Sequence, residues 1–246
     1  MGSADEELKY SVAPKPAPKA GPGEHALRWT KHVDLKDLAA LPAAMETKLA
    51  PNDGVLSLGS SERTPEGKPE KISVSTCTQY LRAIDDGYQP QDTFDASQES
   101  FFKSRCAPLW FLRASQPSRE SHVKDLRLDG PAPLSKLPGK LNLFVASPTE
   151  EEEAAMARGE SLAALNPKAK VTRKDAISLV FVDLEGQFET TIDMIAWGDF
   201  DRDGLEDVLL FQTGHSLEGS FRSYGHRIVT RKAAGAPLVV LHDLRI

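Results

Sequence analysis

The sequence predicts an α+β fold in which a helical N-terminal half packs on a C-terminal antiparallel β-meander. Two observations lead to this prediction. Between residues 34 and 115, apolar residues recur at helical spacing behind residues that cap helices. After residue 176, short apolar runs rich in branched and aromatic residues are joined by short turns that contain glycine. Helices that precede strands along the chain are typical of the α+β class.

The helix signals lie in two parts of the N-terminal half. Residues 34–45 carry leucines at helical spacing behind an aspartate, and a proline should interrupt this helix. Residues 75–115 carry two helices. We expect Asp95 to cap the second of them and Pro108 to kink it or end it early.

Strand signals dominate the C-terminal half. One strand is expected at residues 141–146, followed by a helix with Ser147 as its N-terminal cap. The meander then has five strands, at residues 177–184, 188–197, 207–213, 223–232 and 237–243. We therefore expect a single domain over residues 25–246, helix-rich over 25–170 and β-rich over 171–246.

Length and composition limit the function. The chain has 246 residues and is 40% hydrophobic, enough to bury a core in one domain or in two small ones. A formal net charge of −6 argues against a general nucleic-acid-binding protein. No apolar run approaches the roughly 20 residues that a membrane-spanning helix needs. We expect neither a nucleic-acid partner nor a transmembrane segment.

The N-terminus favours export. Residues 13–23 are rich in proline, alanine, lysine and glycine, so residues 1–24 are expected to form a disordered tether. This tether resembles the spacer after the lipid anchor of a bacterial lipoprotein. Met1 to Ser3 resemble residues left by an expression vector, so we expect the native signal segment, with any lipid anchor, to be missing. The expected location is the periplasm or the cell envelope.

Cys77 and Cys106 are the two cysteines of the chain. An oxidising compartment favours a disulfide bond between them, whereas two buried free thiols are the default in the cytosol. The expected export favours the disulfide. It would close a loop of about thirty residues and stabilise the fold by about 3 kcal/mol.

The most informative segment is the acidic loop, residues 199–207, with the sequence DFDRDGLED. Its aspartates stand at the first, third, fifth and ninth positions, where close carboxylates repel each other by roughly 1 kcal/mol or more unless a cation lies between them. Calcium suits such a loop because it accepts oxygen ligands in a flexible shell. Gly204 permits the sharp turn, and the carbonyl of Leu205 is the expected seventh-position ligand.

The flanks of the acidic loop exclude an EF-hand, because its twelfth position is Leu210 and short apolar strands replace the helices. Residues 195–211 resemble instead the FG-GAP or VCBS type of repeat, a strand, calcium loop and strand unit of secreted and cell-surface proteins. The resemblance implies one structural calcium ion. Its ligands would be the side chains of Asp199, Asp201, Asp203 and Asp207 and the carbonyl of Leu205.

Two points limit the resemblance. The chain contains one copy of the motif, which argues against a propeller built from such repeats. The alternative interpretation of the acidic loop is a polar hairpin whose Asp-Gly pair favours a turn without binding metal.

A hint of catalysis comes from His215 and His226, which flank a loop rich in glycine and serine. The two imidazoles could approach each other and a nearby hydroxyl group for acid–base chemistry. A polar surface loop is the simpler interpretation, and no nucleophile elbow or phosphate loop is present. We therefore predict no catalytic residues.

Together these features favour a non-enzymatic calcium-binding envelope protein that binds another protein. One version is an immunity or inhibitor protein directed at a periplasmic toxin. The alternatives are a calcium-dependent hydrolase of envelope polymers, with catalytic residues in the loop at 214–226, and a structural or adhesion module.

Overall fold

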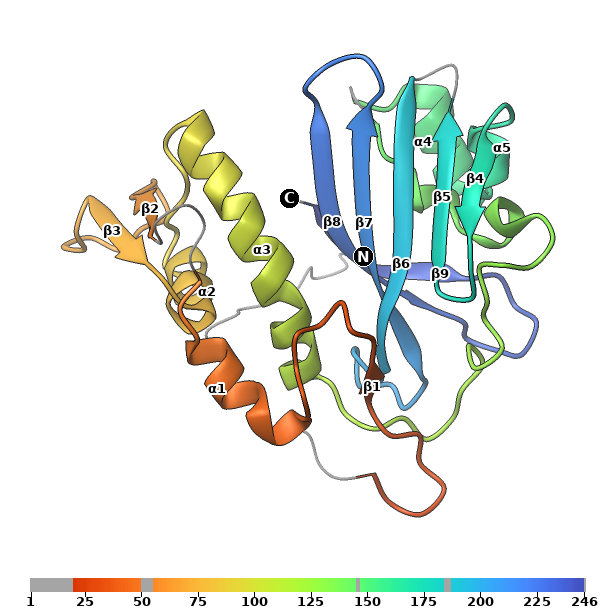
Figure 1. Ribbon diagram of the computed structural model, residues 1–246, viewed down its shortest axis with the longest axis horizontal. Helices are drawn as coiled ribbons and strands as arrows, with labels where there is room; N and C mark the ends of the chain where they lie inside the picture. The colour runs from red at the N-terminus through yellow and green to blue at the C-terminus, as the bar shows by residue number, and fades with distance from the viewer. Residues whose placement is uncertain (1–19, 50–54, 145–146, 184–186, 246) are drawn as a thin grey trace, which may run out of the picture. The chain divides into compact units, whose positions relative to one another are not determined.

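The computed structural model describes residues 20–49, 55–144, 147–183 and 187–245. Residues 1–19, most of the expected tether, therefore lie outside the described residues. The chain divides into two compact units, which are described separately (Figure 1). Unit 1 contains Leu35–Ala114, and unit 2 contains Ala17–Asp34 and Ser115–Ile246.

Unit 1 combines helices with a two-stranded sheet. Its elements are η1 (Leu38–Ala40), α1 (Leu41–Glu46), β2 (Leu56–Gly59), β3 (Lys71–Val74), α2 (Cys77–Asp85) and α3 (Thr93–Ala114). The backbone N–H of Asp95 donates to Asp92 Oδ1 at 2.8 Å, so Asp95 lies in the first turn of α3 and is not its cap. Helix α3 continues through Pro108, where we expected a kink or an early stop.

A disulfide bond joins α2 to α3 in unit 1. The Sγ atoms of Cys77 and Cys106 are 2.10 Å apart and the Cα atoms 5.1 Å apart. Tyr80 of α2 and Phe102 of α3 also pack together, with 5.6 Å between ring centroids. The bond thus lies in a buried contact between the two helices.

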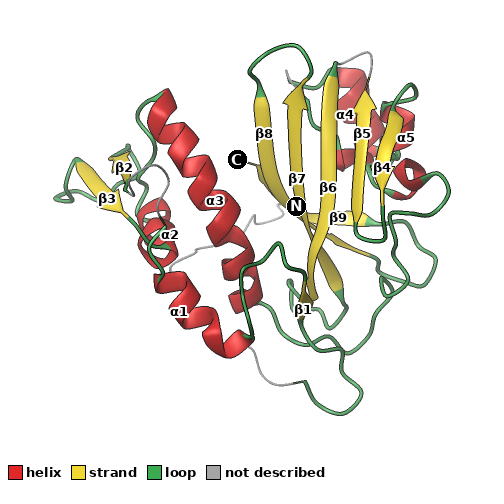
Figure 2. Cartoon of the chain, viewed as in Figure 1, coloured by secondary structure: helices red, strands yellow, loops and turns green. Residues whose placement is uncertain are grey.

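Unit 2 is built on one antiparallel sheet (Figure 2). Its strands are β1 (Arg28–Trp29), β4 (Lys170–Lys174), β5 (Ser178–Asp183), β6 (Phe188–Gly198), β7 (Asp207–Ser216), β8 (Arg222–Thr230) and β9 (Val239–Arg245). Strands β4 to β9 pair in sequence order, and β1 pairs with β6. Each hairpin is therefore local in sequence, and the five strands expected after residue 176 are confirmed.

Irregular chain covers one face of this sheet. Leucines from residues 115–141 form a common core with alternate side chains of β5, β6 and β7. This connection contains η2 (Pro133–Lys136) and η3 (Gly139–Leu141) and has four prolines, at 117, 131, 133 and 138. Because a proline inside a helix removes a backbone hydrogen bond, the leucines reach the core from turns rather than from a continuous helix.

The predicted fold class is wrong. The molecule is mostly antiparallel sheet with few helices, and the N-terminal half is not clearly a helical domain. Strands β1, β2 and β3 and the proline-rich connection lie in the half that we expected to be helix-rich. Among the described residues, the helices that follow that connection are α4 (Glu150–Ala157) and α5 (Leu162–Leu165), and both are short.

Two local predictions around residue 145 also differ. Residues 142–144 are irregular rather than part of a strand, and 145–146 lie outside the described residues. Helix α4 is capped by Thr149 instead of Ser147, in a capping box with Glu152. Among the described residues, no helix has the length and apolar character required to cross a membrane.

Candidate metal centre

The acidic loop connects β6 to β7 in unit 2. The register pairs Gly198 with Asp207, which brings both ends of the loop together at the end of the sheet. The loop turns through two residues with positive φ, Arg202 at 65° and Gly204 at 92°. A Cβ atom on Gly204 would lie 2.5 Å from the guanidinium of Arg119, so glycine serves both the turn and this close approach.

Backbone hydrogen bonds hold the loop against residues 116–120. Gln116 and Asp199 exchange both of their backbone hydrogen bonds, at 3.1 and 2.9 Å. The N–H groups of Arg119 and Glu120 both donate to the carbonyl of Gly204, at 2.8 and 3.2 Å. The loop is therefore fixed from the side as well as at its ends.

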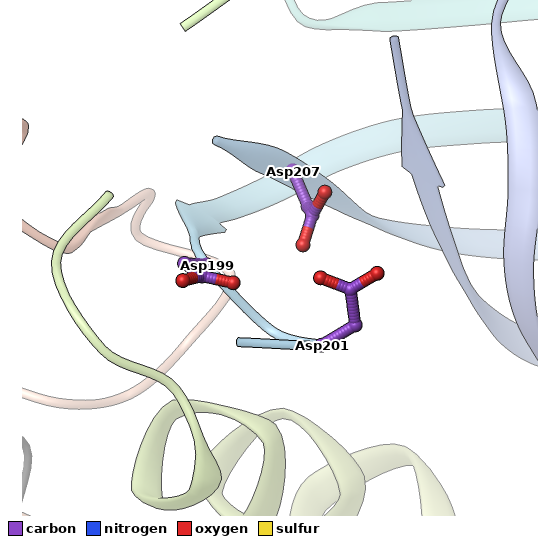
Figure 3. Close-up of side chains that lie close together, drawn as sticks. All are labelled: Asp199, Asp201 and Asp207. Atoms are coloured by element: carbon purple, nitrogen blue, oxygen red, sulfur yellow. The ribbon is translucent and has the colours of Figure 1, made fainter. Parts of the chain in front are cut away.

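Three aspartates of the loop converge. Asp199, Asp201 and Asp207 each offer one carboxylate oxygen, and these oxygens lie within 4.8 Å of one another. Figure 3 shows the three carboxylates facing a common space. Asp199 and Asp207 are completely buried, whereas Asp201 is exposed. This group of three aspartates can hold a metal ion.

Each buried carboxylate uses only one of its oxygens. Asp199 Oδ2 accepts hydrogen bonds from the Gly204 N–H at 2.9 Å and from Gln116 Nε2 at 2.8 Å. Asp207 Oδ2 accepts one from the Phe200 N–H at 2.9 Å. The Oδ1 atoms of Asp199 and Asp207 are buried and find no hydrogen-bond partner among the described residues. A buried anionic oxygen without a partner is costly, and a cation would remove that cost.

The electrostatics reflect this burial. Burial, together with the charges of Asp201 and Asp203, raises the pKa of Asp207 to about 7, although the Thr230 hydroxyl and the hydrogen bond from the Phe200 N–H oppose the change. Burial also raises the pKa of Asp201. Lys232, which follows β8, forms ion pairs with both Asp201 and Asp203. Although burial opposes the change, the hydrogen bond with Lys232 lowers the pKa of Asp203.

Asp203 and Leu205 stand apart from the three aspartates. Asp203 Oδ1 accepts a hydrogen bond from the Leu205 N–H at 2.8 Å, and its other oxygen pairs with Lys232. Within the described residues the metal-competent group does not include Asp203. Whether Asp203 and the Leu205 carbonyl are ligands stays a prediction.

Sequence reasoning missed two partners of the loop, Gln116 and Lys232, and the contacts of Glu206 within it. Gln116 and Lys232 contact the acidic side chains from distant positions in the chain, without a local signal. Glu206 is buried next to Asp207 and pairs with Arg28, with Nη1 2.5 Å from Oε1, while the Ser121 hydroxyl donates to its Oε2 at 2.6 Å. The Glu206 carboxylate is thus held by Arg28 and Ser121. The sequence signal for this residue was its place among the other acidic residues of the loop.

The two histidines considered for catalysis do not meet. The register pairs Phe211 with His226 and His215 with Arg222, so the imidazoles lie four residues apart along the ladder, about 13 Å. His226 is completely buried and its ring lies 5.0 Å from that of Phe211. Burial lowers the pKa of His226 to about 3. The separation argues against a joint acid–base role.

Comparison with known proteins gives no relative: no protein-family model, curated protein or solved structure shows a significant match to this chain. The functional argument therefore rests on the geometry of the acidic loop.

Proposed function

We propose that unit 2 binds one calcium ion at Asp199, Asp201 and Asp207. One observation carries this proposal: the buried, unpartnered Oδ1 atoms of Asp199 and Asp207 belong to carboxylates that converge on Asp201. The Oδ2 atoms of Asp199 and Asp207 accept hydrogen bonds from the backbone of the hairpin. A plain turn would explain these bonds, but it gives no reason for the two Oδ1 atoms to be buried without a partner.

Calcium fits this set better than other common ions. All the available donors are oxygens, which suit hard cations rather than zinc or copper. Magnesium requires a near-ideal octahedron and retains its waters, whereas calcium tolerates an irregular shell of carboxylates, carbonyls and water. The resemblance of residues 195–211 to an FG-GAP or VCBS unit supports the same choice.

The proposed role of the ion is structural. It would bind where β6 ends and β7 begins, two adjacent strands of the sheet. Neutralising Asp199 and Asp207 there would stabilise the end of the hairpin. Because binding to the folded state alone adds free energy of unfolding, calcium at about a hundred times its Kd would add about 2.7 kcal/mol.

The wider proposal is a protein of the bacterial envelope that binds another protein. The disulfide between Cys77 and Cys106 supports an oxidising compartment. Inhibition of a toxin is the version of partner binding that we favour.

A melting experiment on the full chain tests the metal site. Unfolding is followed with calcium, with magnesium at equal concentration, and with a chelator. We expect calcium to raise Tm in a concentration-dependent manner, magnesium to do so less, and calorimetric titration to give a single site. A Tm that is the same in calcium and in chelator would refute the proposal.

A further inference from the structure

Unit 2 contains a pocket of about 440 Å³ next to the acidic loop. Residues 119–125 line one side and the turn at residues 231–235, after β8, contributes to the other, with His25 also in the wall. The pocket touches the loop through Arg119, whose guanidinium packs over Gly204. It is separate from the three aspartates, none of which lines it.

Basic side chains predominate in this pocket. Arg119, Lys124 and Arg231 line it, together with the imidazoles of His25 and His122. Its wall also has two carboxylates, Glu120 and Asp125. The Glu120 carboxylate lies 3.3 Å from Nε2 of His122. Apart from the histidines, three cationic groups line the pocket against two anionic ones, so the pocket favours an anion.

The two guanidinium groups are held in place with donors to spare. Arg231 Nη1 donates to the His122 carbonyl at 3.0 Å. Arg119 Nη2 lies 3.5 Å from the Asp203 carbonyl. Because a guanidinium has five N–H donors in a rigid fork, an arginine fixed by one of them can still present others to a ligand.

We propose that this pocket binds the phosphate group of a small organic phosphate. Two guanidinium groups and a lysine match the charge and the several acceptor oxygens of a phosphate better than those of a single carboxylate. The volume lies in the range of small-molecule sites and exceeds what one phosphate ion fills, so there is room for an organic group. The proposal is independent of calcium.

Calorimetry on the full chain tests this inference, with glycerol 3-phosphate, inorganic phosphate and succinate as probes. A chelator is present throughout, so the result for phosphate does not depend on calcium. Failure of the phosphate proposal and failure of the calcium proposal can therefore be told apart. We expect glycerol 3-phosphate to bind with a millimolar Kd or better, more tightly than inorganic phosphate. Succinate binding as tightly as glycerol 3-phosphate would overturn the phosphate assignment.

Variants then locate the site. Arg231→Gln should weaken binding of glycerol 3-phosphate about tenfold or more, because a charge-assisted hydrogen bond is lost. Arg127→Gln is the matched control: Arg127 pairs with Asp129 outside the pocket, so the same change of charge should leave Kd unaltered. If Arg231→Gln does not fold, the exposed Lys124→Gln replaces it, with a severalfold loss expected. Equal Kd values in pocket and control variants, or no binding by the wild type, would overturn the proposal.

Discussion

Lys232 forms an ion pair with Asp201, with 3.5 Å between Nζ and Oδ2. The same ammonium also pairs with Asp203. A calcium ion coordinated by Asp201 would have to share or displace this interaction. Lys232 is half exposed, so the pair contributes little to stability, about 0 to 1 kcal/mol. Its main effect should be on calcium affinity.

Lys232→Gln is therefore expected to bind calcium about two- to fivefold more tightly than the wild type. The measurement is calorimetric titration at constant ionic strength. Lys174→Gln is the control, because Lys174 donates to the Gly130 carbonyl at 2.9 Å and takes no part in the acidic loop. If both variants change Kd equally, net charge alone accounts for the effect.

Asp207→Asn should abolish the stabilisation by calcium. At about pH 8 the buried Asp207 is ionised in the folded state at a cost, because its pKa is raised from 3.8 to about 7. In a chelator the variant should match or exceed the stability of the wild type, and calcium should add nothing to it. Denaturant unfolding with and without calcium measures both effects.

Asp203→Asn is the matched comparison for that experiment. Asp203 pairs with Lys232 and lies outside the group of three aspartates, so its variant should keep most of the calcium-dependent stabilisation. Complete loss of calcium binding in Asp203→Asn would instead favour the ligand set implied by the FG-GAP resemblance.

Gly204→Ala should weaken the loop. The residue has φ 92°, and an added Cβ would lie 2.5 Å from Arg119 Nη2. Gly159→Ala is the control, with φ 77° and no atom within 4 Å of the added Cβ. In each variant, backbone strain should lower the free energy of unfolding by about 1 kcal/mol. Only Gly204→Ala should also lower calcium affinity, and equal affinities in both would contradict the role given to Gly204.

The sequence predicted the meander well because every hairpin of β5 to β9 joins neighbouring strands, so local apolar runs and turns carry the information. It did not predict the coverage of the sheet. Leu126, Leu134 and Leu137 enter the core from a chain interrupted by prolines, where no periodicity marks them as buried. Without that layer, the helical signals in residues 34–115 dominated the prediction of fold class.

The acidic loop was also predicted only in part. Its aspartates were identifiable from spacing, because carboxylates two residues apart in a tight turn face a common centre. The pairing of Asp203 with Lys232 was not, since 29 residues separate the two and the end of β8 brings them together. A tertiary contact of this kind leaves no local pattern.

Burial of His226 should make the protein less stable at acidic pH. Burial lowers its pKa from 6.5 to about 3, with the charge of Arg227 as the second cause. Below pH 6.5, His226 binds a proton in the unfolded chain but stays neutral in the folded protein. The free energy of unfolding is therefore retained above that pH and falls as the pH drops toward 3. The loss approaches about 1.4 kcal/mol per pH unit, or roughly 2 kcal/mol at about pH 5.

His226→Leu removes this titration and keeps an apolar contact with Phe211. The free energy of unfolding is measured for both proteins by urea denaturation between about pH 7 and about pH 5, in a chelator. Asp207 titrates in both, so its contribution cancels in the difference. The wild type should lose roughly 2 kcal/mol more than the variant over this range. If the two proteins lose the same free energy of unfolding over this range, His226 is protonated as readily in the folded protein as in the unfolded chain, which would contradict the effect given to its burial.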